Sequence, residues 1–137
     1  MADSAPTPLP VLLLVEDNTE QRLMLREFFA DFLACDLREA AEGNSAMALA
    51  LDRRPDLVLL DLHIPPHGGL SLLQTMRADP RLANVPVIVV SGSRLPSERA
   101  SVLAAGAYCF VEKPYDLDLL ESRVFQALKG DAPPEQP

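Results

Sequence analysis

Short apolar runs alternate along this chain with longer segments in which apolar residues recur at helical spacing. Runs rich in branched residues predict buried strands, which we expect at Val11–Val15, Asp56–Asp61, Val87–Val90 and Tyr108–Glu112. A further strand is expected at Asp36–Glu39. Strands that alternate with helices predict repeated βα units around a parallel sheet with right-handed connections.

The first two helices are predicted from their caps and their apolar spacing. Asn18 is the expected N-cap of the first, and Gln21 three positions later completes a pattern like a capping box. Its buried face is expected to hold Leu25, Phe28, Phe29 and Phe32. The second helix is expected from Asn44 to Arg53, and Pro55 stops it.

Three further helices complete the predicted alternation. The third is expected at Leu70–Ala78, after a loop rich in proline and glycine. Ser97 is the expected cap of the fourth, which runs to Ala105 and stops at Gly106. The fifth has Asp116 as its expected cap and a predicted buried stripe of Leu117, Leu120, Val124 and Leu128. The fold class is therefore α/β, with five strands and five helices.

Length and composition favour one soluble, cytoplasmic domain. The chain has 137 residues, 48% of them hydrophobic and 23% charged, which is ordinary for a globular domain. We expect the folded domain at 10–129, with flexible tails at 1–9 and 130–137 because both ends are rich in proline. No apolar stretch has transmembrane length and the start lacks the features of a secretion signal, so no membrane contact is expected.

Charge and cysteine usage exclude further classes. A formal net charge of −8 and a pI near 4.6 argue against nucleic-acid binding, which normally needs clustered Lys and Arg. The two cysteines, Cys35 and Cys109, lie in or beside apolar runs without another Cys or His at metal-ligand spacing. We therefore expect both to be buried thiols.

Polar residues follow the predicted strands where chemistry would be expected. Glu16 and Asp17 follow the first strand, Asp61 ends the third, and Ser91 and Lys113 follow the fourth and fifth. Parallel strands present their carboxyl ends at one edge of a sheet, so these side chains are expected to converge. Carboxylates suit Mg²⁺, while a hydroxyl and an ammonium suit phosphoryl oxygens. The set predicts Mg²⁺-assisted phosphoryl transfer.

Over most of residues 10–129 the chain resembles the receiver domains of two-component response regulators. The resemblance lies in Val15-Glu16-Asp17-Asn18, Asp61-Leu62-His63-Ile64-Pro65 through Gly69, Ser91-Gly92 and Lys113-Pro114, in that order and spacing. It implies a flavodoxin-like, doubly wound sheet of strand order 2-1-3-4-5. It also implies that Asp61 accepts a phosphoryl group from a histidine kinase or a histidine phosphotransfer protein.

The resemblance also assigns roles residue by residue. Asp17, Asp61 and the backbone carbonyl of His63 would bind Mg²⁺, and Glu16 would act through water. Ser91 and Lys113 would contact the phosphoryl group, and Ser91 and Phe110 would form the switch. The resemblance further implies a cis Lys113-Pro114 peptide, and a downstream target bound at the face of the fourth helix, fifth strand and fifth helix.

Several alternatives stay open at this point. His63 and His67 allow a zinc site, although their carboxylate neighbours favour magnesium. A second hypothesis for His63 is that its side chain tunes the lifetime of the Asp61 phosphate, because it lies where attacking water must pass. Ile64 stands where Met is frequent in the family.

Three functions compete. The first is a single-domain signalling regulator that is not an enzyme, apart from weak loss of its own phosphate. The second is a Mg²⁺-dependent phosphatase-like hydrolase with Asp61 as nucleophile, although such enzymes usually have an acid where His63 stands. The third is a pseudo-receiver that binds partners without phosphate.

Overall fold

The computed structural model describes residues 8–134, along which five strands and five helices alternate. The strands are β1 (Val11–Val15), β2 (Asp36–Ala40), β3 (Leu57–Asp61), β4 (Val87–Ser91) and β5 (Cys109–Glu112). The helices are α1 (Thr19–Phe32), α2 (Gly43–Asp52), α3 (Gly69–Ala78), α4 (Pro96–Ala104) and α5 (Leu117–Lys129). The predicted alternation is confirmed. Of the predicted tails, residues 1–7 and 135–137 lie outside the described residues.

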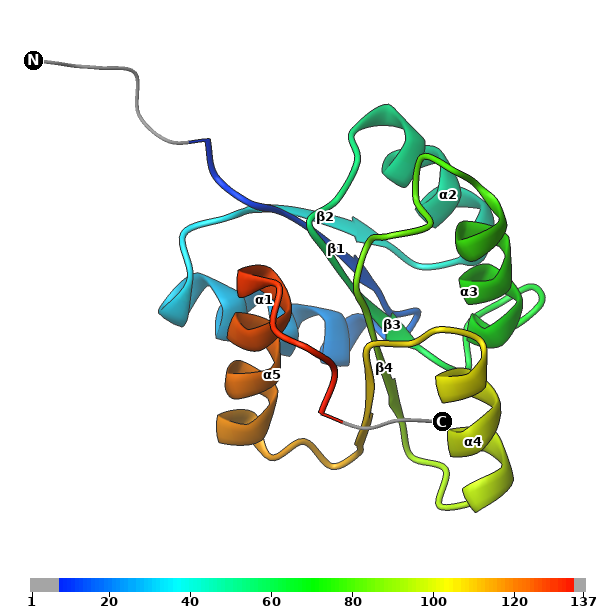
Figure 1. Cartoon of the computed structure of the whole chain (residues 1–137). Coiled ribbons are helices and arrows are strands. Elements are labelled where there is room, and N and C mark those ends of the chain that lie inside the picture. Colours follow the sequence, from blue (N-terminus) through cyan, green and yellow to red (C-terminus); the bar gives the residue numbers. More distant parts are fainter. Residues whose placement is uncertain (1–7, 135–137) are drawn as a thin grey trace, which may run out of the picture.

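The strands form one parallel sheet in the order β2-β1-β3-β4-β5, as predicted. Figure 1 shows α1 and α5 on one face of the sheet and α2, α3 and α4 on the other. β2 lies on one side of β1, and β3 and the later strands lie on its other side. Ligands of open α/β sheets bind where the strand order reverses in this way, outside the carboxyl ends of the strands. The doubly wound, flavodoxin-like architecture therefore places the ends of β1 and β3 side by side.

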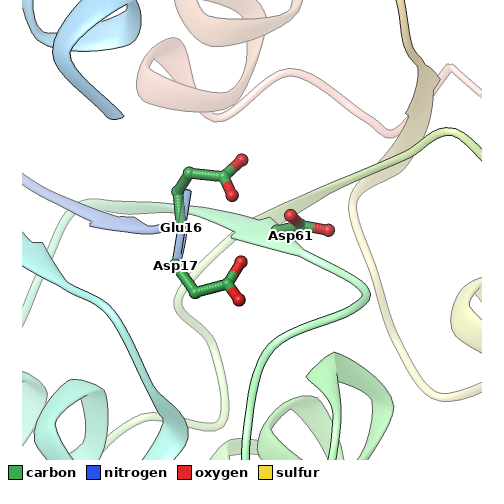
Figure 2. A group of neighbouring side chains, drawn as sticks. All are labelled: Glu16, Asp17 and Asp61. Atoms are coloured by element: carbon green, nitrogen blue, oxygen red, sulfur yellow. The ribbon is translucent and has the colours of Figure 1, made fainter. Parts of the chain in front are cut away.

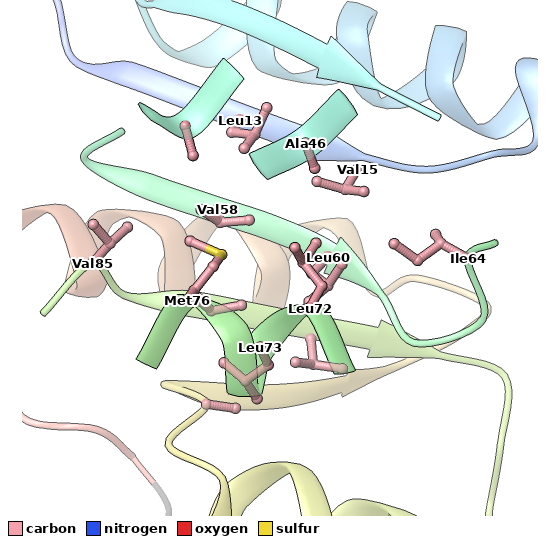
Figure 3. Packing of buried hydrophobic residues seen from close by; sticks show 14 of the residues in the cluster. Leu13, Val15, Ala46, Val58, Leu60, Ile64, Leu72, Leu73, Met76 and Val85 are labelled. Atoms are coloured by element: carbon pink, nitrogen blue, oxygen red, sulfur yellow. The ribbon is translucent and has the colours of Figure 1, made fainter. Parts of the chain in front are cut away.

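Alternate strand residues supply two separate hydrophobic cores. Leu13, Val15, Val58 and Leu60 pack with α2 and α3 residues such as Ala46, Leu73 and Met76 (Figure 3). Their sequence neighbours Leu12, Leu14, Leu57 and Leu59 pack on the opposite face against α1 and α5. Every residue of β1, β3 and β4 is buried, which explains why these strands are continuous apolar runs up to Asp61 at the end of β3 and Ser91 at the end of β4.

Two helix predictions were wrong in detail. α4 begins at Pro96, with Leu95 rather than Ser97 at the N-cap position, because proline lacks an N–H and loses no hydrogen bond in the first turn. In α5 the cap is confirmed, since the Asp116 side chain accepts a hydrogen bond from the Leu119 amide. Leu117, however, is 43% exposed because it is the first residue of α5 and lines a surface cavity.

Neither cysteine forms a disulfide, but they differ in burial. Cys109 lies on β5 and is fully buried in the core beside α5, as predicted. Cys35 is only partly buried, since it lies in the loop before the edge strand β2. Burial raises the pKa of the Cys35 thiol, and the neighbouring Asp36 carboxylate raises it further, so Cys35 stays protonated near neutral pH.

The start of α3 approaches the end of β3 so closely that only glycine fits at position 69. A Cβ atom at Gly69 would lie 2.6 Å from the carbonyl oxygen of Asp61 and 2.8 Å from Cα of Leu62. Gly68 before it has φ of +85°, a conformation that glycine adopts without strain. These two glycines set the return of the chain from Asp61 into α3.

Replacing Gly69 with alanine should therefore destabilise the domain. We expect Gly69→Ala to lower the free energy of unfolding by about 1–3 kcal/mol, the usual cost of overpacking a well-packed site. Chemical denaturation would measure it. Gly92→Ala is the matched control, because nothing lies within 4 Å of a Cβ atom there. Equal stability of Gly69→Ala and Gly92→Ala would contradict the steric argument.

Candidate functional site

Three carboxylates converge at the carboxyl ends of β1 and β3. One carboxylate oxygen from each of Glu16, Asp17 and Asp61 lies within 4.8 Å of the others (Figure 2). Glu16 is 1% exposed and Asp61 5% exposed, whereas Asp17 faces solvent. The predicted convergence of these acids is confirmed, and two of them, Glu16 and Asp61, are buried.

The ammonium of Lys113 reaches this group from β5, on the other side of β4. Its Nζ atom donates to Oε1 of Glu16 at 3.2 Å and to Oδ2 of Asp61 at 3.1 Å. The Lys113 amide donates to the Ser91 carbonyl at 2.8 Å, which continues the pairing of β4 and β5 past the last strand residue. The Lys113-Pro114 peptide is cis, as the resemblance implied.

Backbone amides hold the other oxygen of each buried carboxylate. Oε2 of Glu16 accepts from the Asn18 amide at 3.1 Å, and Oδ1 of Asp61 accepts from the His63 amide at 3.0 Å. The predicted capping box is therefore half right. Asn18 caps α1 by accepting from the Gln21 amide, but Glu16, not the Gln21 side chain, accepts from the Asn18 amide.

Negative charge exceeds positive charge at this group, since three carboxylates face one ammonium. Burial raises the pKa of the Glu16 carboxyl, and the Asp61 carboxylate raises it further. The Asn18 amide and Lys113 oppose this rise. A divalent cation would offset the excess charge, and carboxylate oxygens are the ligands that Mg²⁺ prefers. The residues present therefore fit a magnesium ion.

The histidines do not fit a zinc site. Within residues 8–134, the group of acids at Glu16, Asp17 and Asp61 is the one set of three possible metal-binding side chains that lie close together, and it contains no histidine. The His63 side chain is 61% exposed, and its Nε2 lies 3.9 Å from Glu98 of α4. His67 is exposed. The preference for an oxygen-binding ion over zinc agrees with this geometry.

Ser91 and Phe110 lie on the neighbouring strands β4 and β5. Ser91 is fully buried at the end of β4, and its hydroxyl oxygen accepts from the Ser93 amide at 3.0 Å. The Phe110 ring is 5% exposed and packs in the core on the side of α2, α3 and α4. The guanidinium of Arg99 on α4 lies 5.2 Å from the centre of that ring, within cation–π range.

Two residues at the site were missed by the sequence analysis. Arg22 of α1 donates to the Glu16 carbonyl at 2.9 Å and thereby fixes the backbone between the two adjacent acids. Tyr115 packs beside Lys113, with 5.9 Å between its ring centre and Nζ. The one signal for Tyr115 in the sequence is its position two residues after Lys113, while nothing local distinguishes Arg22 from other helix-surface arginines.

None of the helices in the described part of the chain is both long enough and apolar enough to cross a membrane.

Comparisons with known proteins give one consistent family. The model of the response regulator receiver domain matches residues 12–125. The chemotaxis protein CheY of Pseudomonas aeruginosa is 26% identical over 122 residues, which cover 87% of this chain and 98% of CheY. The DNA-binding dual master transcriptional regulator RpaA of Synechocystis is 26% identical over 121 residues, but this chain spans only half of its length.

Solved structures give the same result. A putative response regulator from Chloroflexus aurantiacus superposes with a TM-score of 0.83 at 25% identity, over 90% of this chain and 99% of that one. Together with the family match, this similarity confirms the fold that the resemblance implied.

Magnesium should stabilise the folded chain through the three acids. A ligand that binds only the folded state at about 100 times its Kd adds about 2.7 kcal/mol to the free energy of unfolding. We expect added Mg²⁺ to raise the thermal midpoint, and Asp17→Asn to remove most of that rise. Asp31→Asn, at an exposed carboxylate on α1, is the control. A rise as large in Asp17→Asn as in the unaltered chain would place the ion elsewhere.

Proposed function

Because this chain belongs to the response regulator receiver domain family, we propose that it accepts a phosphoryl group on Asp61 and signals in a phosphorelay. One observation carries the proposal. Lys113 and the His63 amide each bind one oxygen of the buried Asp61 carboxylate, so its orientation is fixed before any phosphoryl group arrives. A nucleophile that is already oriented lowers the entropic part of the barrier to phosphoryl transfer.

The transfer itself needs only one nucleophile from this chain. A carboxylate oxygen of Asp61 forms a bond to phosphorus, while the bond from phosphorus to the imidazole nitrogen of a phosphohistidine donor breaks. The departing nitrogen keeps the bonding electron pair, and the product is an acyl phosphate on Asp61. The donor is proposed to be a histidine kinase or a histidine phosphotransfer protein.

Mg²⁺ is the proposed cofactor. Asp17, Asp61 and the backbone carbonyl of His63 would bind it directly, and Glu16 would act through water. When bound, the ion supplies positive charge that offsets charge on the phosphoryl oxygens. The exposure of Asp17 supports its role as a direct ligand, because its carboxylate is open to an ion from solvent.

Ser91 and Lys113 are the proposed contacts to the bound phosphoryl group. Lys113 already lies 3.1 Å from Asp61, and the Ser91 hydroxyl lies at the end of the next strand. Phe110 is proposed to couple this site to the surface, together with Ser91. Its ring is buried beneath Arg99, so a movement of α4 would change the packing of both residues.

The face formed by α4, β5 and α5 is the proposed surface for a downstream target. A groove of about 350 Å³ lies there, lined by residues of all three elements that include Arg99, Phe110, Leu119 and Arg123. Phosphorylation would shift the population of conformations that bind the target. With a net charge of −8, the chain itself is not proposed to bind nucleic acid. The single-domain form and the cytoplasmic location stay predictions.

Phosphorylation can be tested directly. We expect incubation with Mg²⁺ and acetyl phosphate to add one phosphoryl group, measured by intact mass, and Asp61→Asn to abolish the adduct. Asp31→Asn should leave it unchanged. A chain that gains no adduct would be a pseudo-receiver. Steady turnover of varied phosphoesters without a lasting adduct would indicate a hydrolase instead, and either result would overturn the proposal.

The lifetime of the adduct should depend on His63. Its exposed side chain extends from the loop that follows Asp61 toward Glu98 of α4, so we propose that it obstructs water approaching the acyl phosphate. His63→Ala should then speed the loss of the Asp61 phosphate several-fold. His67→Ala, in the same loop, is the matched control. An unchanged rate in His63→Ala would reject this role.

A further inference from the structure

Tyr115 lies against the lysine that holds the acid group together, and nothing in the proposed mechanism uses it. The chain continues from β5 through Lys113 and the cis peptide to Tyr115, which brings the ring to 5.9 Å from the Lys113 Nζ atom. That distance is within the range over which an aromatic face attracts an ammonium. Nζ therefore has the ring near it in addition to the Glu16 and Asp61 oxygens.

The same ring forms part of the wall of a surface cavity. Lys113 and Tyr115 line this cavity of about 540 Å³ together with Gln21, Met24, Pro114 and Leu117. The Lys113 side chain is only 19% exposed, although it borders this open space. An aromatic wall beside a lysine limits both its rotamers and its access to water, and each effect favours the conformation that reaches the acids.

The hydroxyl group of Tyr115 does not help to hold the ring in place. It is buried and has no hydrogen-bond partner among the described residues, so it does not fix the ring through a bond of its own. Burial raises the pKa of the Tyr115 hydroxyl, and the carboxylates of Glu16 and Asp61 raise it further. The group therefore stays neutral and does not compete with the two carboxylates for the Lys113 ammonium.

We propose that Tyr115 is a positioning residue whose ring holds the Lys113 ammonium at the Asp61 carboxylate for phosphoryl transfer. The inference rests on the proposed function of the site and adds a residue that acts through Lys113. It assigns the effect to the aromatic ring and none to the hydroxyl. Phenylalanine at position 115 should therefore support phosphoryl transfer as well as tyrosine does, whereas an aliphatic side chain should not.

The test follows phosphorylation by acetyl phosphate at saturating Mg²⁺ as a function of donor concentration. Tyr115→Leu should slow the plateau rate about threefold to tenfold, the range of a cation–π contact, with little change in the half-saturating concentration. Tyr115→Phe should stay within about twofold of the unaltered chain and have an equal or higher thermal midpoint, because it removes an unpartnered hydroxyl. Tyr108→Phe, at the only other tyrosine, controls for loss of a hydroxyl far from Lys113.

A comparison in a second background separates positioning from a general loss of structure. In Lys113→Met, the further change Tyr115→Leu should cost nothing more, because the group that the ring holds is gone. Equal slowing in both backgrounds would overturn the proposal, as would a Tyr115→Phe rate as low as that of Tyr115→Leu. If Tyr115→Leu does not fold, Tyr115→Met takes its place in both backgrounds, and a Tyr115→Met rate equal to that of the unaltered chain overturns the proposal.

The proposed function and this inference fail differently. No phosphorylation of the unaltered chain refutes the former, whereas phosphorylation at the same rate with and without the ring refutes only the latter.

Discussion

The contact between the Lys113 ammonium and the buried carboxylates of Glu16 and Asp61 is the interaction on which the site depends. Two carboxylates at 1% and 5% exposure repel each other in surroundings that screen charge poorly. One ammonium, at 3.2 and 3.1 Å, offsets part of that repulsion. It comes from the end of β5, two strands away from β3, so the contact exists only when β3, β4 and β5 are paired in the sheet. Tertiary structure, and no local sequence element, brings the ammonium to Asp61.

Two backbone amides bind the carboxylate oxygens that the Lys113 ammonium does not contact. The amides of Asn18 and His63, each two residues after the carboxylate that it binds, give both loops the same local geometry. Behind the second loop, Gly69 lets α3 start against the carbonyl of Asp61. The third carboxylate of the group, that of Asp17, faces solvent. A site built this way is fixed at Asp61 and open to solvent at Asp17.

Much of this arrangement was predictable from the sequence because its determinants are local. Continuous apolar runs marked the inner strands, and the positions of Asp61 and Lys113 after two of them located the site. Errors arose where tertiary packing decides. Leu117 fits the apolar period of α5 but lies beyond the core, and the Gln21 side chain lost its capping role to Glu16. Tyr115 could not be assigned because its contact with Lys113 depends on how the chain turns after β5.

The hydrogen bond from the Ser93 amide to the Ser91 hydroxyl has a mechanical consequence. The hydroxyl holds one amide of the loop that leads from β4 to α4, and its position is governed by one side-chain torsion. Rotation about that torsion would release the Ser93 amide and remove one restraint on the loop. The conformation of a single buried side chain at the end of β4 is therefore linked to that of the backbone that leads to α4.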